Sequence, residues 1–257
     1  MEKPEEMIVI SDPGMVGRAE HNTGDRAVVV VANLFAWIFP ALIIAIVAQV
    51  GLRQSGMNQA WLDDLQWWLY GASMMIGIGY AVTTSSHVRV DIFFANFSRK
   101  RQTRVEIFGL VWLFLPFVIL SWDLTLHYAI ASIQAREGSD SPNGLHMLYL
   151  LKTFANLSFV FIGIAVWAAY VRFLGKLTHP ALWKQLLFAF PSTMFLTNLA
   201  VYYALYWWVF LTGPEDLNPR QIPNEPVFAY TVTAAAVATI LLIALAWLLR
   251  RKTLKDA

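Results

Sequence analysis

Six long runs of apolar residues divide the chain, and short polar segments separate them. The runs cover residues 27–50, 65–85, 106–129, 152–174, 186–211 and 227–249. Each run holds 21–26 residues, and a helix of about 20 residues crosses the hydrocarbon core of a bilayer. The runs are continuous, whereas the strands of a membrane barrel are short and alternate in polarity. The pattern therefore predicts an all-α integral membrane protein with six transmembrane helices.

Composition supports a protein that is surrounded by lipid. Hydrophobic residues make up 58% of the chain and charged residues only 14%, whereas ordinary soluble domains carry about 25% charged residues. No loop between the runs exceeds 22 residues, which is too short for an independent domain. The chain has no cysteine, so a disulfide framework and a thiolate metal site are both excluded.

The distribution of lysine and arginine predicts the orientation of the helices. With six spans, 15 of the 19 basic residues fall on the side of the two termini. Because cytoplasmic loops are enriched in Lys and Arg, both termini are expected in the cytoplasm. Residues 1–26 then form a cytoplasmic tail with six acidic residues. We therefore expect the first run to remain as an anchor and not to be a cleaved signal peptide.

Two segments have the pattern of interfacial helices. Residues 58–69 place Trp61, Leu65 and Trp68 on one face, and a similar apolar stripe follows Thr178, which is a candidate N-cap. Each segment could instead form the first turns of the span that follows it. The spacing of Thr103 and Glu106 predicts a capping box at the start of the third helix.

Histidine placement argues against a haem-binding or enzymatic membrane subunit. Four of the five histidines fall in tails or loops, and His127 alone lies in a run, near its end. Two facing histidines inside the spans, which bis-histidine haem ligation needs, are therefore not expected, and no phosphate-binding loop is present. We expect no catalytic residue, no cofactor and no metal ion, and the sequence offers no nucleic-acid motif.

Asp123 lies within the third run. An ionisable side chain inside the bilayer is energetically costly, so a specific role is expected for it. His127 follows four residues later, on the same helical face. The pair could relay protons or bind a cation. We favour a hydrogen-bonded pair in a helix–helix contact, because a transport path needs further polar residues at this depth on neighbouring helices. The amides of Asn156 and Asn198 are expected to form interhelical hydrogen bonds.

Three short motifs in the loops and at helix boundaries resemble the small membrane subunit of tripartite ATP-independent periplasmic (TRAP) transporters. They are Asp63-Asp64-Leu65-Gln66-Trp67-Trp68-Leu69-Tyr70-Gly71 before the second run, His87-Val88-Arg89-Val90-Asp91 after it, and Glu137-Gly138-Ser139 with Leu150-Leu151-Lys152 before the fourth. The His-x-Arg-x-Asp motif is the most specific. The resemblance covers residues 27–174, which we expect to form a four-helix small-permease core.

The resemblance implies a non-catalytic scaffold of a transporter in the bacterial inner membrane. In such transporters a periplasmic substrate-binding protein delivers a substrate, typically an organic acid, to a small and a large membrane subunit. The large subunit holds the substrate and sodium sites, and an ion gradient drives transport. The small subunit forms a stable complex with the large permease subunit and contacts the binding protein transiently.

The charged loop residues have expected roles of their own. Arg89 and Asp91 are expected to form ion pairs that anchor the inner end of the second helix. Glu137 and Asp140 could receive the binding protein, or Glu137 could pair with Lys152 and close the loop.

One feature departs from the family pattern, because four spans are usual and residues 175–257 add a fifth and a sixth. Two other interpretations remain open. A self-sufficient six-helix carrier or channel predicts broken helices and polar residues inside several spans. The membrane anchor of an enzyme complex predicts paired histidines or acids inside the membrane.

Overall fold

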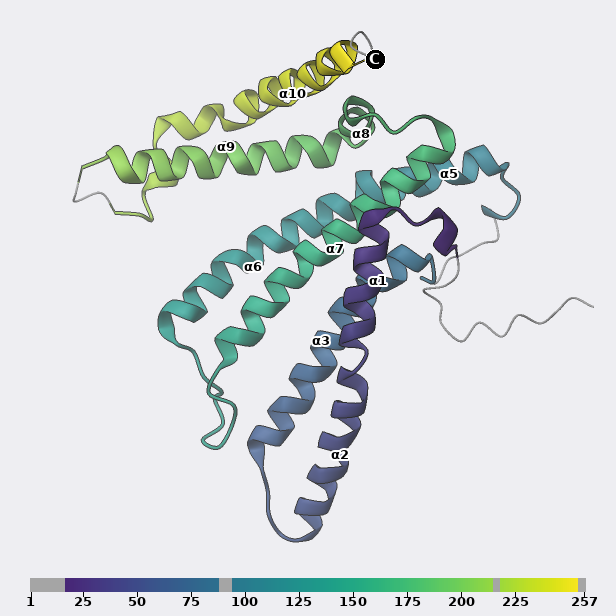
Figure 1. The fold of residues 1–257 in the computed structure, drawn as a ribbon. Coiled ribbons are helices and arrows are strands. Elements are labelled where there is room, and N and C mark those ends of the chain that lie inside the picture. Colours follow the sequence, from purple (N-terminus) through teal and green to yellow (C-terminus); the bar gives the residue numbers. More distant parts are fainter. Residues whose placement is uncertain (1–16, 88–93, 215–217, 254–257) are drawn as a thin grey trace, which may run out of the picture. The chain divides into compact units, whose positions relative to one another are not determined.

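A computed structural model describes residues 17–87, 94–214 and 218–253, and every regular element in these ranges is helical (Figure 1). The main helices are α1 (Thr23–Phe35), α2 (Ile38–Gln54), α3 (Ala60–Thr84), α5 (Arg99–Phe108), α6 (Leu115–Ala135), α7 (Leu148–Leu177), α8 (Leu182–Phe188), α9 (Phe190–Thr212) and α10 (Thr231–Thr253). Short helices are η2 (Arg18–Glu20), the π-helical η3 (Gly109–Phe114), η4 (Ile222–Asn224) and η5 (Pro226–Tyr230). The all-α prediction is confirmed.

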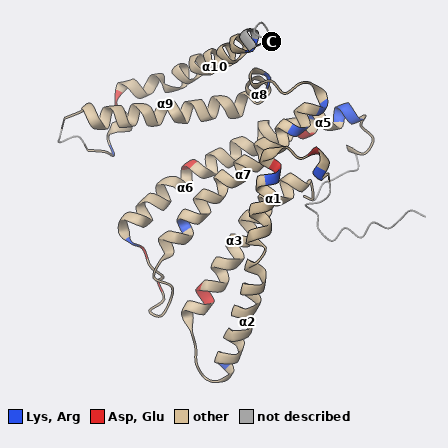
Figure 2. Ribbon diagram, in the orientation of Figure 1, with Lys and Arg blue, Asp and Glu red and all other residues tan. Residues whose placement is uncertain are grey.

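Among the residues that the structure describes, five helical segments are long and apolar enough to cross a membrane. They are Thr23–Gln54, Arg99–Ala135, Leu148–Leu177, Phe190–Thr212 and Pro226–Arg250, and most charged residues lie near helix ends (Figure 2). The second predicted span is the helix α3, whose 25 residues would reach about 37 Å. Its N-terminal half carries two aspartates and three tryptophans, so α3 is less apolar than the others. The class of membrane protein is confirmed, whereas the count of six spans and the orientation stay predictions.

The first span is broken by a proline into α1 and α2. Pro40 has no N–H, and its ring would collide with the carbonyl four residues earlier, at Ala36. The break falls at Ala36 and Trp37, where the Trp37 N–H donates to the Leu34 carbonyl at 3.3 Å. The sequence-based boundary of this run did not predict the kink.

The structure corrects two helix starts that the sequence predicted. Thr103 is not an N-cap, because α5 begins at Arg99 and the Thr103 hydroxyl donates to the Arg99 carbonyl inside the helix at 3.0 Å. Thr178 is not the N-cap of α8, which begins at Leu182 after Ala181. Residues 60–69 are the first turns of α3, which is the alternative left open above, while α8 is separated from α9 at Ala189.

The chain forms two compact units that alternate along the sequence. The first contains the described residues up to Ser98 together with Leu120–Arg172, and the second contains Arg99–Ile119 together with the described residues from Phe173 onward. In the first unit, α1 and α2 each pack on α3. In the second unit, α9 and α10 pack as a hairpin (Figure 1).

A π-helical turn attaches α9 to the rest of the second unit. In η3 the Leu115 N–H donates to the Leu110 carbonyl, five residues back. In the same five-residue pattern, the Val111 carbonyl would accept a hydrogen bond from residue 116. Residue 116 is a proline and has no N–H, so this carbonyl has no donor in its own helix. Ser192, which is fully buried, donates its hydroxyl to this carbonyl at 2.5 Å. The Val111 carbonyl thus attaches the fifth predicted span, α9, to the helix that contains η3.

Removing this contact should loosen the second unit. We expect Ser192→Ala to lower the free energy of unfolding in detergent by about 1–2 kcal/mol, because the buried Val111 carbonyl loses its donor. Ser158→Ala is the matched control, because Ser158 is also buried but donates within its own helix, to Phe154. Equal effects of the two changes in thermal unfolding would contradict an interhelical role for Ser192.

Candidate functional site

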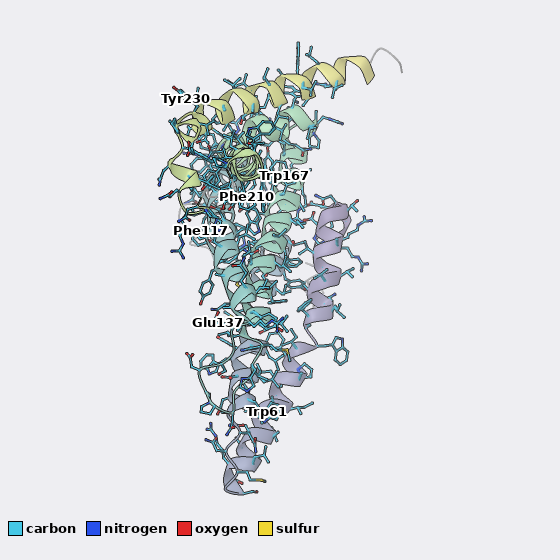
Figure 3. All side chains as sticks on the ribbon, turned by 90° about the vertical axis from the view of Figure 1, so that its left-hand side faces the viewer. Trp61, Phe117, Glu137, Trp167, Phe210 and Tyr230 are labelled. Atoms are coloured by element: carbon cyan, nitrogen blue, oxygen red, sulfur yellow. The ribbon has the colours of Figure 1, made fainter. Side chains whose placement is uncertain are left out.

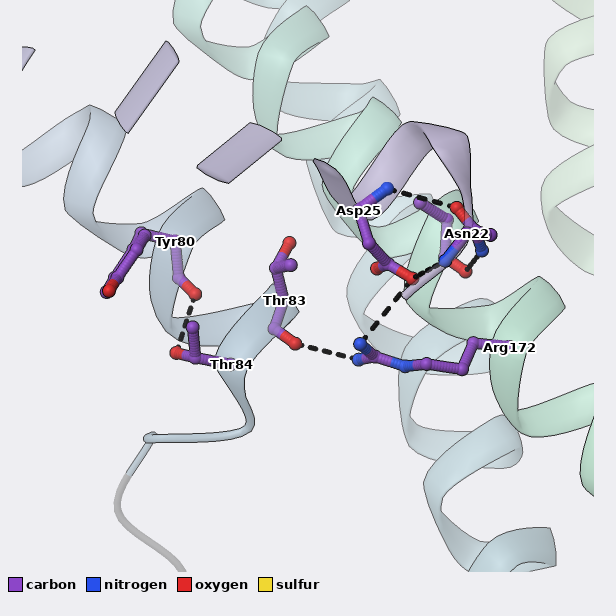
Figure 4. Close-up of polar contacts among 7 residues, drawn as sticks. Asn22, Asp25, Tyr80, Thr83, Thr84 and Arg172 are labelled. Carbon is purple, nitrogen blue, oxygen red and sulfur yellow. Dashed lines mark hydrogen bonds and ion pairs between the residues drawn. The ribbon is translucent and has the colours of Figure 1, made fainter. Parts of the chain in front are cut away.

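A buried ion pair joins three helices of the first unit where α1 begins and α3 and α7 end (Figure 4). The Arg172 guanidinium lies 3.5 Å from the Asp25 carboxylate, and the two side chains are 8% and 0% exposed. The same guanidinium donates to the Thr83 carbonyl at 2.8 Å. One arginine from α7 therefore holds α1 through a carboxylate and α3 through a backbone carbonyl. We call Asp25, Arg172 and Thr83 the polar clamp.

The start of α1 is fixed by a capping box that also reaches α7. The Asn22 side chain accepts from the Asp25 N–H at 3.0 Å, and the Asp25 carboxylate accepts from the Asn22 N–H at 3.1 Å. The Asn22 amide in turn donates to the Ala168 carbonyl at 2.8 Å. A side chain at Gly24 would come within 2.9 Å of the Ala168 Cβ, so the glycine allows the close approach of α1 and α7.

A second buried titratable group lies beside the polar clamp, just before α1. His21 is 5% exposed, and burial, assisted by the positive charge of Arg172, lowers its pKa below the ordinary value. The imidazole is therefore neutral near pH 7. The polar clamp itself pairs one cation, Arg172, with one anion, Asp25.

Asp64 ties the long loop after α6 back onto α3. Its carboxylate accepts a hydrogen bond from the Leu145 N–H at 2.9 Å. A side chain at Gly144 would collide with Asp64 and Ser139, so glycine is needed for this close approach. Asp64, which the sequence singled out, has a loop-closing contact within the chain.

The predicted pair of Glu137 and Lys152 is formed. The Lys152 ammonium donates to the Glu137 carboxylate and lies 3.8 Å from the centre of the Tyr128 ring. The hydrogen bond from Lys152 lowers the pKa of Glu137 below its ordinary value. Glu137, labelled in Figure 3, thus closes the loop onto α7, whereas Asp140 is exposed.

The acidic–aromatic motif at the start of α3 lies at the surface of the first unit. Asp63 accepts two hydrogen bonds from Arg53, both at 2.8 Å, and this pair is exposed. Trp67 is 73% exposed. His87 is exposed after the end of α3, while Arg89 and Asp91 lie outside the described residues. The structure therefore positions only the first residue of the His-x-Arg-x-Asp motif.

Asp123 and His127 lie on α6, half-buried and exposed respectively. In the part of the chain that the structure describes, no three His, Asp or Glu side chains gather where they could hold a metal ion. Asn156 forms the interhelical bonds expected of it, because its amide donates to the Trp122 carbonyl and to the Thr125 hydroxyl, each at 2.8 Å. Polar side chains in this region join helices.

Sequence reasoning missed the polar clamp. Asn22 and Asp25 have the spacing of a capping box, and this local signal was available directly before the first apolar run. Arg172 lies near the end of the predicted run 152–174 and enters the orientation count only as one of the basic residues on the cytoplasmic side. Nothing local indicates that it reaches Asp25, because the two residues are 147 positions apart and the contact depends on how α1 packs on α7.

The helical fold and its long apolar helices define a multi-pass membrane protein. The sequence pattern of the tripartite ATP-independent periplasmic transporters, DctQ component, matches residues 42–174, which is just over half of the chain. The chain belongs to this family, and is the small membrane subunit of a TRAP transporter. Such transporters also contain a large permease subunit and a binding protein. No curated protein and no solved structure matches the chain.

The polar clamp should be far more important for stability than the exposed ion pair of the same unit. We expect Asp25→Ala to lower the free energy of unfolding by about 3–5 kcal/mol, because Arg172 would stay buried without its partner. Asp63→Ala, which breaks the exposed pair with Arg53, should lower it by less than about 1 kcal/mol. Thermal unfolding of both variants in detergent checks the difference, and a small effect of Asp25→Ala would contradict the clamp.

The loop after α6 should become less protected in acid. Because Lys152 depresses the pKa of folded Glu137, the pair stabilises the loop above the pKa of an unperturbed glutamate, about 4.3. This stabilisation is lost as the pH falls through the lower, folded pKa. The protection factors for hydrogen exchange of residues 136–147, relative to the intrinsic rate at each pH, should fall over this range, and Glu137→Gln should show low protection at every pH. Unchanged acid sensitivity in Glu137→Gln would contradict the assignment.

Proposed function

We propose that the chain is a non-catalytic scaffold that braces the large permease subunit of a TRAP transporter in the bacterial inner membrane. Its family supports the assignment to this transporter. As the resemblance implies, the transporter imports an organic acid with an ion gradient, and the substrate and ion sites belong to the large subunit. The chain contributes a rigid membrane frame.

The observation that carries the proposal is that the buried polar side chains of the first unit join its helices and loops to one another. Arg172 joins α1, α3 and α7, Asn156 joins α6 to α7, and Asp64 and Lys152 fasten one loop. Each of these groups has its partner inside the chain. A frame needs such contacts, whereas a transport pathway needs polar groups that face a passage for the substrate.

The remaining site residues receive roles within this proposal. Arg89 and Asp91 form ion pairs, within the chain or with the large subunit, at the inner headgroups. Asp123 and His127 hold a helix–helix contact. Because Glu137 already pairs with Lys152, Asp140 is the acidic residue of this loop that is left to meet the binding protein. Trp67, His87 and the pair of Asp63 with Arg53 stabilise the ends of α3.

Reconstitution tests the proposal. The chain alone, in liposomes with a sodium gradient, should take up no organic acid, because in this proposal the substrate site belongs to the large subunit. Addition of the large subunit and the substrate-loaded binding protein should start uptake. Uptake by the chain alone would identify it as a self-sufficient carrier and refute the scaffold function. A complex of large subunit and binding protein that transports equally well without the chain would also refute it.

A further inference from the structure

An open groove of about 220 Å³ lies on the first unit beside the kink between α1 and α2. Ala32 and Ala36 line it from α1 and the kink, Phe39 lines it from α2, and Ile76 and Gly77 line it from α3. A side chain at Gly77 would meet no atom within 4 Å. Small residues on both walls therefore leave space beside a membrane-spanning helix, which is the feature that allows another helix to approach closely.

Two polar side chains are exposed near the kink, and one of them, Asn33, lines the groove. Asn33, which lines it, and Trp37 lie four residues apart, and both are exposed, Trp37 to 75%. Neither side chain hydrogen-bonds to another group among the described residues. Both lie within about 10 Å of helix rise from the middle of the span Thr23–Gln54. An amide and an indole N–H thus face outward at the depth of the acyl chains.

The chemistry of these two groups selects the kind of partner. Acyl chains have no hydrogen-bonding atoms, so lipid would leave the Asn33 amide and the Trp37 N–H unsatisfied. The indole is a donor only, and the amide is both donor and acceptor. The complementary surface is therefore a protein helix that presents an acceptor beside the groove, such as a polar side chain or a carbonyl left free by a helix break.

We propose that Asn33, Trp37 and the groove beside them form the contact with a transmembrane helix of the large permease subunit. The inference rests on the proposed function, since the large subunit is the membrane partner that a scaffold must hold. Asn33 and Trp37 supply the polar complementarity, and the small residues at Ala32, Ala36 and Gly77 supply the space. The kink produced by Pro40 sets the angle between the two halves of this face.

Photo-crosslinking tests the contact directly. p-Benzoylphenylalanine at position 33 or 37, in the chain coexpressed with the large subunit, should crosslink to the large subunit on illumination. The same residue at Leu124 is the matched control, because Leu124 is 64% exposed on α6 of the same unit but is not among the residues that line the groove. The control position should give at most a minor product with the large subunit.

A substitution then tests the hydrogen bond. Asn33→Leu keeps a similar volume and should weaken binding of the large subunit about threefold to tenfold. It should not lower the unfolding temperature of the isolated chain, because Asn33 has no hydrogen-bond partner among the described residues. Asn156→Leu should lower that temperature, because Asn156 is buried and bonded within the chain.

The outcomes separate the inference from the proposed function. Crosslinks from positions 33 and 37 to lipid only, or to a second copy of the chain, in a complex that still contains the large subunit would overturn the inference and leave the scaffold function standing. Unchanged binding by Asn33→Leu would overturn the role of the amide. If the unaltered chain forms no complex with the large subunit, the scaffold function fails, and this contact fails with it.

Discussion

Apolar side chains gain little by leaving lipid for one another, so helices in a membrane are held in place by close packing and by polar groups that lipid cannot satisfy. The polar clamp shows this constraint most directly. Arg172 has no favourable place in lipid, and it is satisfied only when α1 brings Asp25 and α3 brings the Thr83 carbonyl. The mutual position of three helices thus follows from the hydrogen-bonding needs of one guanidinium.

The same constraint explains how the chain uses two prolines inside its apolar runs. Pro116 leaves the Val111 carbonyl without a donor in its own helix, and Ser192 supplies that donor from α9. Pro40 breaks the helix at Ala36 and Trp37, and the groove of the first unit opens at this break. In both places a proline removes a backbone hydrogen bond from one helix. Another element of the same unit lies beside that point.

The apolar runs predicted the helices because their length and continuity are local properties of the sequence. The pair of Glu137 and Lys152 could also be predicted from the sequence, because the two residues flank one loop. Long-range contacts were not. In the local sequence, Asp25 is one of several acidic residues in the N-terminal tail, and Arg172 is one of many basic residues, so nothing nearby indicates that they pair. The kink and the π-turn follow from Pro40 and Pro116, but a proline alone does not say whether a helix bends, ends or changes its hydrogen bonding.

The last two helices extend the family pattern without forming a separate domain. They lie outside the matched residues 42–174, yet they share a compact unit with Arg99–Ile119, which lies inside the match. Their attachment uses a carbonyl that Pro116 exposes within the matched region, and the Trp112 indole adds a bond to the Phe188 carbonyl at 2.8 Å. A chain that ended after α7 would leave Val111 unsatisfied in the absence of a substitute donor. The extension and the π-turn therefore depend on each other, and the helix that carries η3 is shaped to receive α9.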